Sequence, residues 1–96
     1  MPEVIVKLYT SLREIAGEKE TKVNAETIKE VLKILSEKYG NEFKNHLLDE
    51  NGNLKPFFHI MVNGRKMGLL DGVETRLKDG DVLDIFPPVG GGYYEH

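Results

Sequence analysis

The chain has 96 residues and no cysteine, and its 13 basic and 16 acidic residues give a formal net charge of -3 at pH 7. This length allows one small domain, and the lack of cysteine excludes disulfides, thiolate metal sites and cysteine nucleophiles. We expect no nucleic acid as a partner and no membrane span, because the chain has neither a dense basic stripe nor an apolar stretch near the roughly 20 residues that cross a bilayer. The first residues do not resemble a signal peptide, so the sequence predicts a cytoplasmic protein.

The first third of the chain predicts two paired strands with a short helix between them. Residues 4–9 are rich in β-branched and aromatic side chains, which is typical of a strand, and residues 11–17 indicate a helical turn that ends at a glycine. Residues 21–23 again have strand character. We expect these two strands to pair as a hairpin across the helical turn.

The main helix is predicted to begin after Thr27, which forms a capping box with Glu30 three residues later. Apolar side chains then recur at helical spacing as far as Gly40, and these are Ile28, Val31, Leu32 and Leu35. One face of this helix is therefore apolar, and we expect it to cover a sheet. Residues 43–48 predict a short second helix before a polar turn at residues 49–53.

The second half of the chain predicts three further strands. Residues 57–62 indicate the third strand, and the Asn-Gly pair at 63–64, the strongest hairpin signal in the chain, leads into a short fourth strand at 65–67. Residues 69–77 are irregular. An aspartate-rich turn then leads into the last strand, residues 82–86.

These elements occur in the order of the β-grasp, an α+β fold in which a mixed, curled sheet packs on one main helix. No linker, repeat or low-complexity segment divides the chain. We expect a single domain over residues 1–92, whose residues 87–92 form a glycine-rich tail, followed by a short extension at 93–96.

Strand alternation predicts which side chains lie on the face of the sheet that the helix leaves open. When the apolar positions face the helix, the outward positions include Tyr9, His59, Met61 and Phe86. An exposed aromatic patch usually marks a partner surface, so we interpret these four residues as an interface. Scattered apolar residues on an open sheet, with no partner, are the alternative interpretation.

The last strand continues into a tail of two prolines, one valine and three glycines, which are Pro87, Pro88, Val89, Gly90, Gly91 and Gly92. The prolines fix φ near -65° and hold the base of the tail extended, while the glycines lack Cβ and can pass through a narrow channel. At roughly 3.3 Å per extended residue, the last four of these residues reach about 13 Å. The sequence therefore predicts a tail that enters a partner's active site.

Four segments carry a resemblance to a known family. They are LYTSLREIAG at residues 8–17, VNG at 62–64, LKDGDV at 77–82 and IFPPVGGG at 85–92. Together and in this order they resemble the MoaD/ThiS family of ubiquitin-like sulfur carriers, and above all the MoaD branch, the small subunit of molybdopterin synthase. The resemblance covers residues 4–92 and implies the same β-grasp fold.

The resemblance also implies a function. In such carriers an E1-like adenylyltransferase activates the C-terminal glycine with ATP and magnesium, and a sulfur donor then displaces AMP to leave a thiocarboxylate. In molybdopterin synthase the tail inserts into the large subunit, where the thiocarboxylate supplies sulfur to a pterin precursor of the molybdenum or tungsten cofactor. By this resemblance Gly92 would carry the acyl-adenylate and then the thiocarboxylate, and the chain is no enzyme by itself and binds no cofactor.

The same resemblance assigns partner contacts on the open face. Phe86 and Tyr9 match aromatic positions with which family members contact their partners, and Arg13 matches a polar contact at that surface. A packed ring and a solvated charge are the alternative interpretations of Tyr9 and Arg13. No metal site is expected, because the three histidines, His46, His59 and His96, lie far apart with no ligand spacing.

The chain departs from the family pattern at its end, because Tyr93 to His96 follow Gly92 and an internal amide cannot be adenylated. Three explanations remain open: removal by a protease, such as a metalloprotease of the JAMM type; an origin in an expression vector; or loss of carrier activity. Two other functions also remain open. The chain is then either a protein modifier that forms isopeptide bonds with lysines, or a non-catalytic binding module.

Overall fold

The strands assemble into one mixed sheet. In the computed structural model, which describes residues 1–88, five strands pair in the order β2-β1-β5-β3-β4. They are β1 (Glu3–Leu8), β2 (Glu20–Asn24), β3 (His59–Val62), β4 (Arg65–Lys66) and β5 (Val82–Phe86). β1 and β5 run parallel, and the other neighbouring strands pair antiparallel. This is the β-grasp arrangement that the order of elements predicts.

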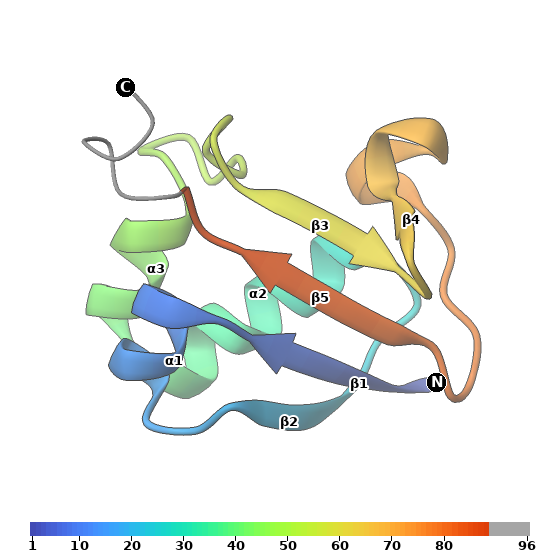
Figure 1. Cartoon of the computed structure of the whole chain (residues 1–96), viewed down its shortest axis with the longest axis horizontal. Coiled ribbons are helices and arrows are strands. Elements are labelled where there is room, and N and C mark those ends of the chain that lie inside the picture. Colours follow the sequence, from blue (N-terminus) through green and yellow to red (C-terminus); the bar gives the residue numbers. More distant parts are fainter. Residues whose placement is uncertain (89–96) are drawn as a thin grey trace.

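Helices cover one face of this sheet. The main helix α2 (Ile28–Tyr39) crosses behind the sheet in Figure 1, and the shorter α1 (Thr10–Ala16) and α3 (Asn41–Leu47) lie at the end where β1 and β5 finish. The segment that the sequence predicts as irregular contains two single 3-10 turns, η1 (Met67–Leu69) and η2 (Gly72–Glu74). No helix among residues 1–88 covers the other face of the sheet, which we call the open face.

The core lies between the sheet and α2. The side chains that alternation predicts to face the helix are buried, and they are Val4, Val6, Leu8, Phe58, Ile60, Val62, Leu83 and Ile85. The apolar positions of the helix are buried as well, and they are Ile28, Val31, Leu32 and Leu35. Both periodicities, 2.0 for the strands and 3.6 for the helix, are therefore confirmed.

Two local predictions are corrected. The third strand begins at His59 instead of residue 57, because Phe58 N–H donates to the carbonyl of Lys55 at 3.2 Å in a turn that leaves Phe57 outside the ladder. The capping box is only half formed. Glu30 N–H donates to Thr27 Oγ1 at 3.2 Å, but the Glu30 carboxylate accepts from Glu26 N–H at 2.7 Å instead of from the N-cap residue.

A network centred on Asn63 joins the β3–β4 turn to β5 and β1. Asn63 and Gly64 have φ values of 49° and 84°, as the two central residues of a type I′ turn require. Asn63 Nδ2 donates to Asp81 Oδ1, and Val82 N–H donates to Asn63 Oδ1, both at 2.9 Å. The Asp81 carbonyl accepts from Ile5 N–H at 2.9 Å. This network therefore fixes the point at which β5 begins beside β1.

We predict that Asn63→Ala lowers the free energy of unfolding by about 2–3 kcal/mol. The substitution removes two side-chain hydrogen bonds, and it places alanine at a positive φ that alanine tolerates less well than asparagine. Asn63→Gly is the matched control, since it loses the same hydrogen bonds but tolerates the backbone conformation. We expect it to be destabilised by less. Urea unfolding measures both, and wild-type stability of Asn63→Ala would contradict the structural role of this network.

Candidate functional site

The parallel pairing of β1 and β5 brings the ends of two strands to one edge of the sheet. Leu8 pairs with Ile85 at the last position of this ladder, so the next residues, Tyr9 and Phe86, lie side by side on the open face. Their rings stack with centroids 4.6 Å apart and planes 16° apart. Such a stack contributes about 0.5–1.5 kcal/mol beyond its buried area. Tyr9, which follows β1, and Phe86, the last residue of β5, thus form an aromatic pair where the tail begins.

The antiparallel pairing of β3 with β5 completes this surface. His59 lies opposite Phe86, and Met61 lies opposite Asp84. His59 is exposed, whereas Tyr9, Met61 and Phe86 are half-buried. The predicted outward facing of these side chains is confirmed, and their role as partner contacts stays a prediction.

Asp84 fixes the position of Tyr9. The Tyr9 hydroxyl donates to Asp84 Oδ1 at 2.6 Å. This hydrogen bond to a carboxylate, followed by partial burial of the ring, raises the pKa of Tyr9 above its ordinary value. Alternation along β5 puts Asp84 on the same face as Phe86, but no sequence pattern predicts this bond, because the bond depends on β1 and β5 being neighbours.

Arg13 lies over the ring of Tyr9. Its guanidinium carbon is 5.8 Å from the centroid of the Tyr9 ring, within the range of a cation–π contact. Arg13 Nε also donates to the carbonyl of Leu8 at 3.3 Å. The predicted site residue Arg13 therefore belongs to the same surface as Tyr9 and Phe86, with its guanidinium held in place.

The base of the tail is the last described part of the chain. Pro87 is buried and Pro88 is exposed. The remaining predicted tail residues, Val89, Gly90, Gly91 and Gly92, lie outside the described residues, as does the extension from Tyr93 to His96.

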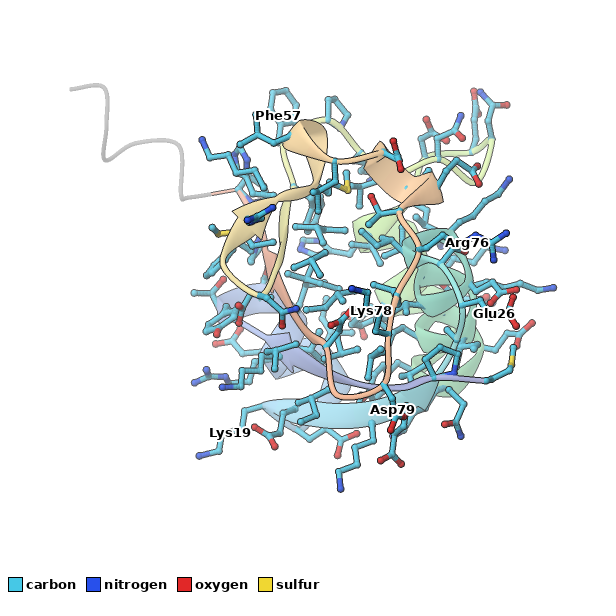
Figure 2. All side chains as sticks on the ribbon, turned by 90° about the vertical axis from the view of Figure 1, so that its right-hand side faces the viewer. Lys19, Glu26, Phe57, Arg76, Lys78 and Asp79 are labelled. Atoms are coloured by element: carbon cyan, nitrogen blue, oxygen red, sulfur yellow. The ribbon has the colours of Figure 1, made fainter. Side chains whose placement is uncertain are left out.

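Phe57 is an exposed aromatic residue that the prediction of an interface misses. It lies two residues before His59, which pairs with Phe86, and 69% of its surface is exposed. Figure 2 shows Phe57 at the periphery of the molecule. Strand alternation could have identified it, because residue 57 has the same outward parity as His59 and Met61. The predicted strand over residues 57–62 includes Phe57, but the predicted interface does not.

His46 and His59 lie in different surroundings and do not form a metal site together. Ser11 Oγ and His46 Nε2 lie within hydrogen-bond distance, 2.8 Å apart, and the His46 ring meets Phe58 edge-on at 5.7 Å. Among residues 1–88, no three His, Cys, Asp or Glu side chains are grouped closely enough to hold a metal ion. In the same part of the chain, no helix is both long and apolar enough to cross a membrane.

Comparison with known proteins places this chain in a family. The model of the ThiS family matches residues 6–92, and the chain belongs to this family. The small archaeal modifier protein 3 of Haloferax volcanii is 34% identical over 93 residues, which cover 94% of this chain and 99% of the relative. The sulfur carrier protein CysO of Mycobacterium tuberculosis is 32% identical over 92 residues, which cover 93% and 98%.

Solved structures share the fold. The small archaeal modifier protein 1 of Methanosarcina acetivorans has a TM-score of 0.87 and 38% identity, covering 96% of this chain and 98% of that chain. A Pyrococcus furiosus protein provisionally identified as subunit 1 of a molybdopterin converting factor has a TM-score of 0.73 and 27% identity, covering 93% and 100%. The chain is thus a member of a family of small ubiquitin-like sulfur carriers and modifiers, which are not themselves catalysts.

We predict that Asp84→Asn lowers the pKa of Tyr9 relative to the wild type, because it removes the charge that holds the phenol proton while conserving the shape of the side chain. Phenolate absorbance during an alkaline titration measures this shift, with Tyr9→Phe subtracted to isolate Tyr9. Tyr39 is the internal control. Burial, followed by its hydrogen bond to Glu18, raises the pKa of Tyr39 to about 12, and Asp84→Asn should leave it unchanged. An unshifted Tyr9 midpoint would show that Asp84 does not control this group.

Proposed function

We propose that the chain is a sulfur carrier whose Gly92, once residues 93–96 have been removed, is activated as an acyl-adenylate and converted to a thiocarboxylate. One observation carries the proposal. The parallel β1–β5 pair sets the stacked rings of Tyr9 and Phe86 at the base of a proline- and glycine-rich tail, on a face that no helix among residues 1–88 covers. Membership of the ThiS family supports it.

The chemistry requires a free carboxylate on Gly92. While Gly92 is joined to Tyr93 by an amide, no carboxylate is available to attack ATP. Hydrolysis of that bond consumes one water and supplies the carboxylate, and a protease of the JAMM type is the proposed catalyst. The carboxylate then attacks the α-phosphorus of ATP and releases pyrophosphate, in an E1-like adenylyltransferase that holds magnesium. A donor at the oxidation level of sulfide next forms the C–S bond as the bond to AMP breaks.

The body of the domain is proposed to dock through the open face while the tail enters the partner. Tyr9, Phe86 and Met61 form the apolar part of this surface, His59 lies beside them, and Arg13 is its fixed cation. Pro87 and Pro88 restrict the base of the tail, so less conformational entropy is lost on insertion. Val89 and the glycines would span the partner's channel.

Molybdopterin synthesis is the proposed destination of the sulfur, with the large subunit of molybdopterin synthase as the second partner. The segment from Phe86 to Gly92 supports this choice by its resemblance to the MoaD tail, and the similarity to the Pyrococcus furiosus protein supports it as well. A role as a protein modifier is the second candidate, favoured by similarity to two archaeal modifier proteins. Both roles need the same activated Gly92 and differ in the nucleophile that receives it.

We predict that the chain isolated from its native cells has lost residues 93–96 and carries sulfur in place of one oxygen at Gly92. Intact-mass spectrometry measures both changes. A Gly92 remnant on lysines of other proteins would favour the modifier role instead. Full-length chains with an unmodified mass in every growth condition would contradict the carrier proposal.

We further predict that Phe57→Ala weakens docking of the mature chain to its activating enzyme. An exposed aromatic residue beside a docking surface contributes about 1–2 kcal/mol when it is buried at the interface, so KM should rise about fivefold to thirtyfold with little change in kcat. Leu69→Ala is the matched control, since Leu69 is 79% exposed but lies in η1, beyond the other end of β3. Equal KM values for the two variants would exclude Phe57 from the interface.

A further inference from the structure

The open face contains a small basic depression beside the aromatic pair. Its volume is about 200 Å³, and it is lined by Lys7, Tyr9, Arg13, Lys19 and Glu20. Lys7 belongs to β1 and Arg13 to α1, Tyr9 lies between these two elements, Lys19 precedes β2, and Glu20 is the first residue of β2. In Figure 2, Lys19 lies on the side of the molecule away from α2, at the edge of the sheet. We call this site the basic depression.

The cations of the basic depression form no ion pair within 4 Å among residues 1–88, although Glu20 and Asp84 lie opposite Lys7 in the registers of the two neighbouring strands. The two ion pairs among residues 1–88 are Lys38–Glu18 and Arg76–Glu26, so Lys7, Arg13 and Lys19 each lie more than 4 Å from any carboxylate there. Glu20 is the one acidic residue of the lining. Asp84 lies opposite Lys7 in the sheet register, but its Oδ1 accepts from the Tyr9 hydroxyl. Three cations thus gather on one face of a chain whose net charge is -3.

The Arg13 guanidinium is positioned to donate hydrogen bonds to a planar acceptor. Its Nε donates to the Leu8 carbonyl and its guanidinium lies over the Tyr9 ring, whereas no described group accepts a hydrogen bond from its terminal nitrogens. A guanidinium fixed in this way presents parallel N–H groups that match the two oxygens of a carboxylate. Lys7 and Lys19 add charge at the rim, which speeds and orients the encounter of two proteins.

We propose that the basic depression binds an acidic segment of the E1-like activating enzyme, with a carboxylate of that segment on Arg13. This inference rests on the proposed function and names the partner chemistry of the same face. Polypeptide carboxylates fit the site better than the phosphates of a nucleic acid, because Glu20 and Asp84 beside the cations would repel a continuous row of phosphates. The aromatic pair would then supply contact area while the depression sets orientation.

A pair of charge-reversed variants tests this proposal. The chain ending at Gly92 is compared with its Lys7→Glu/Lys19→Glu variant and its Lys29→Glu/Lys33→Glu variant. Lys29 and Lys33 are exposed on α2 and line a different hollow on the helical side, so the second variant has the same net charge but an unchanged open face. ATP–pyrophosphate exchange by the activating enzyme is measured against carrier concentration and salt.

We expect the reversal at Lys7 and Lys19 to raise KM about tenfold at low salt, with kcat within about twofold, and to lose the dependence of KM on salt. The reversal on α2 should leave KM within about twofold. Arg13→Lys should raise KM as well, because it keeps the charge but loses the planar pair of donors.

Four results would overturn the inference. Equal effects of the two reversals would show that net charge acts, and not this site. A wild-type KM for the Lys7→Glu/Lys19→Glu variant would remove the basic depression from the interface while leaving the proposed function intact, because the enzyme still activates the chain. If the unsubstituted chain binds a single-stranded oligonucleotide and the Lys7→Glu/Lys19→Glu variant does not, the site is assigned to nucleic acid. Failure of the unsubstituted chain ending at Gly92 to be activated would overturn the proposed function together with this inference.

Discussion

The parallel pairing of β1 with β5 is the constraint on which the rest of this structure depends. It places the first strand of the chain beside the last, so that both end at the same edge of the sheet. Two residues far apart in the sequence, Tyr9 and Phe86, thereby become stacked neighbours, and Asp84 comes within hydrogen-bond distance of the Tyr9 hydroxyl. In a different strand order Tyr9 and Phe86 would not be neighbours, and the tail would not begin beside a stacked aromatic pair.

This pairing is secured at its other end by polar groups. The Asn63 side chain forms hydrogen bonds with the Asp81 carboxylate and with Val82 N–H, and the Asp81 carbonyl accepts a hydrogen bond from Ile5 N–H. These bonds set the register in which β5 starts, and the register decides which side chains of β5 face outward. The segments VNG and LKDGDV, which resemble family motifs, thus act in the fold, while LYTSLREIAG and IFPPVGGG contribute residues to the open face.

Local patterns predict much of this arrangement. The period-2 alternation of the strands correctly places Tyr9, His59, Met61 and Phe86 on the open face, and the Asn-Gly pair correctly predicts the hairpin. What the sequence does not reveal depends on contacts between distant segments. The Asp84–Tyr9 bond needs the β1–β5 neighbourhood, which no local pattern specifies. The basic depression forms where β1, α1 and β2 meet. Phe57 escapes notice because the turn before β3 removes it from a strand that propensity alone would extend.

The open face combines an aromatic stack, a fixed guanidinium and two lysines that form no ion pair among residues 1–88. Such a surface suits a carrier that must dock firmly and present only its terminus. The measurement that tests this account most directly compares the chain ending at Gly92 with the 96-residue chain in pyrophosphate release by the activating enzyme and ATP. The account predicts release from the shorter chain alone. Equal release from both chains, or from neither, would contradict it.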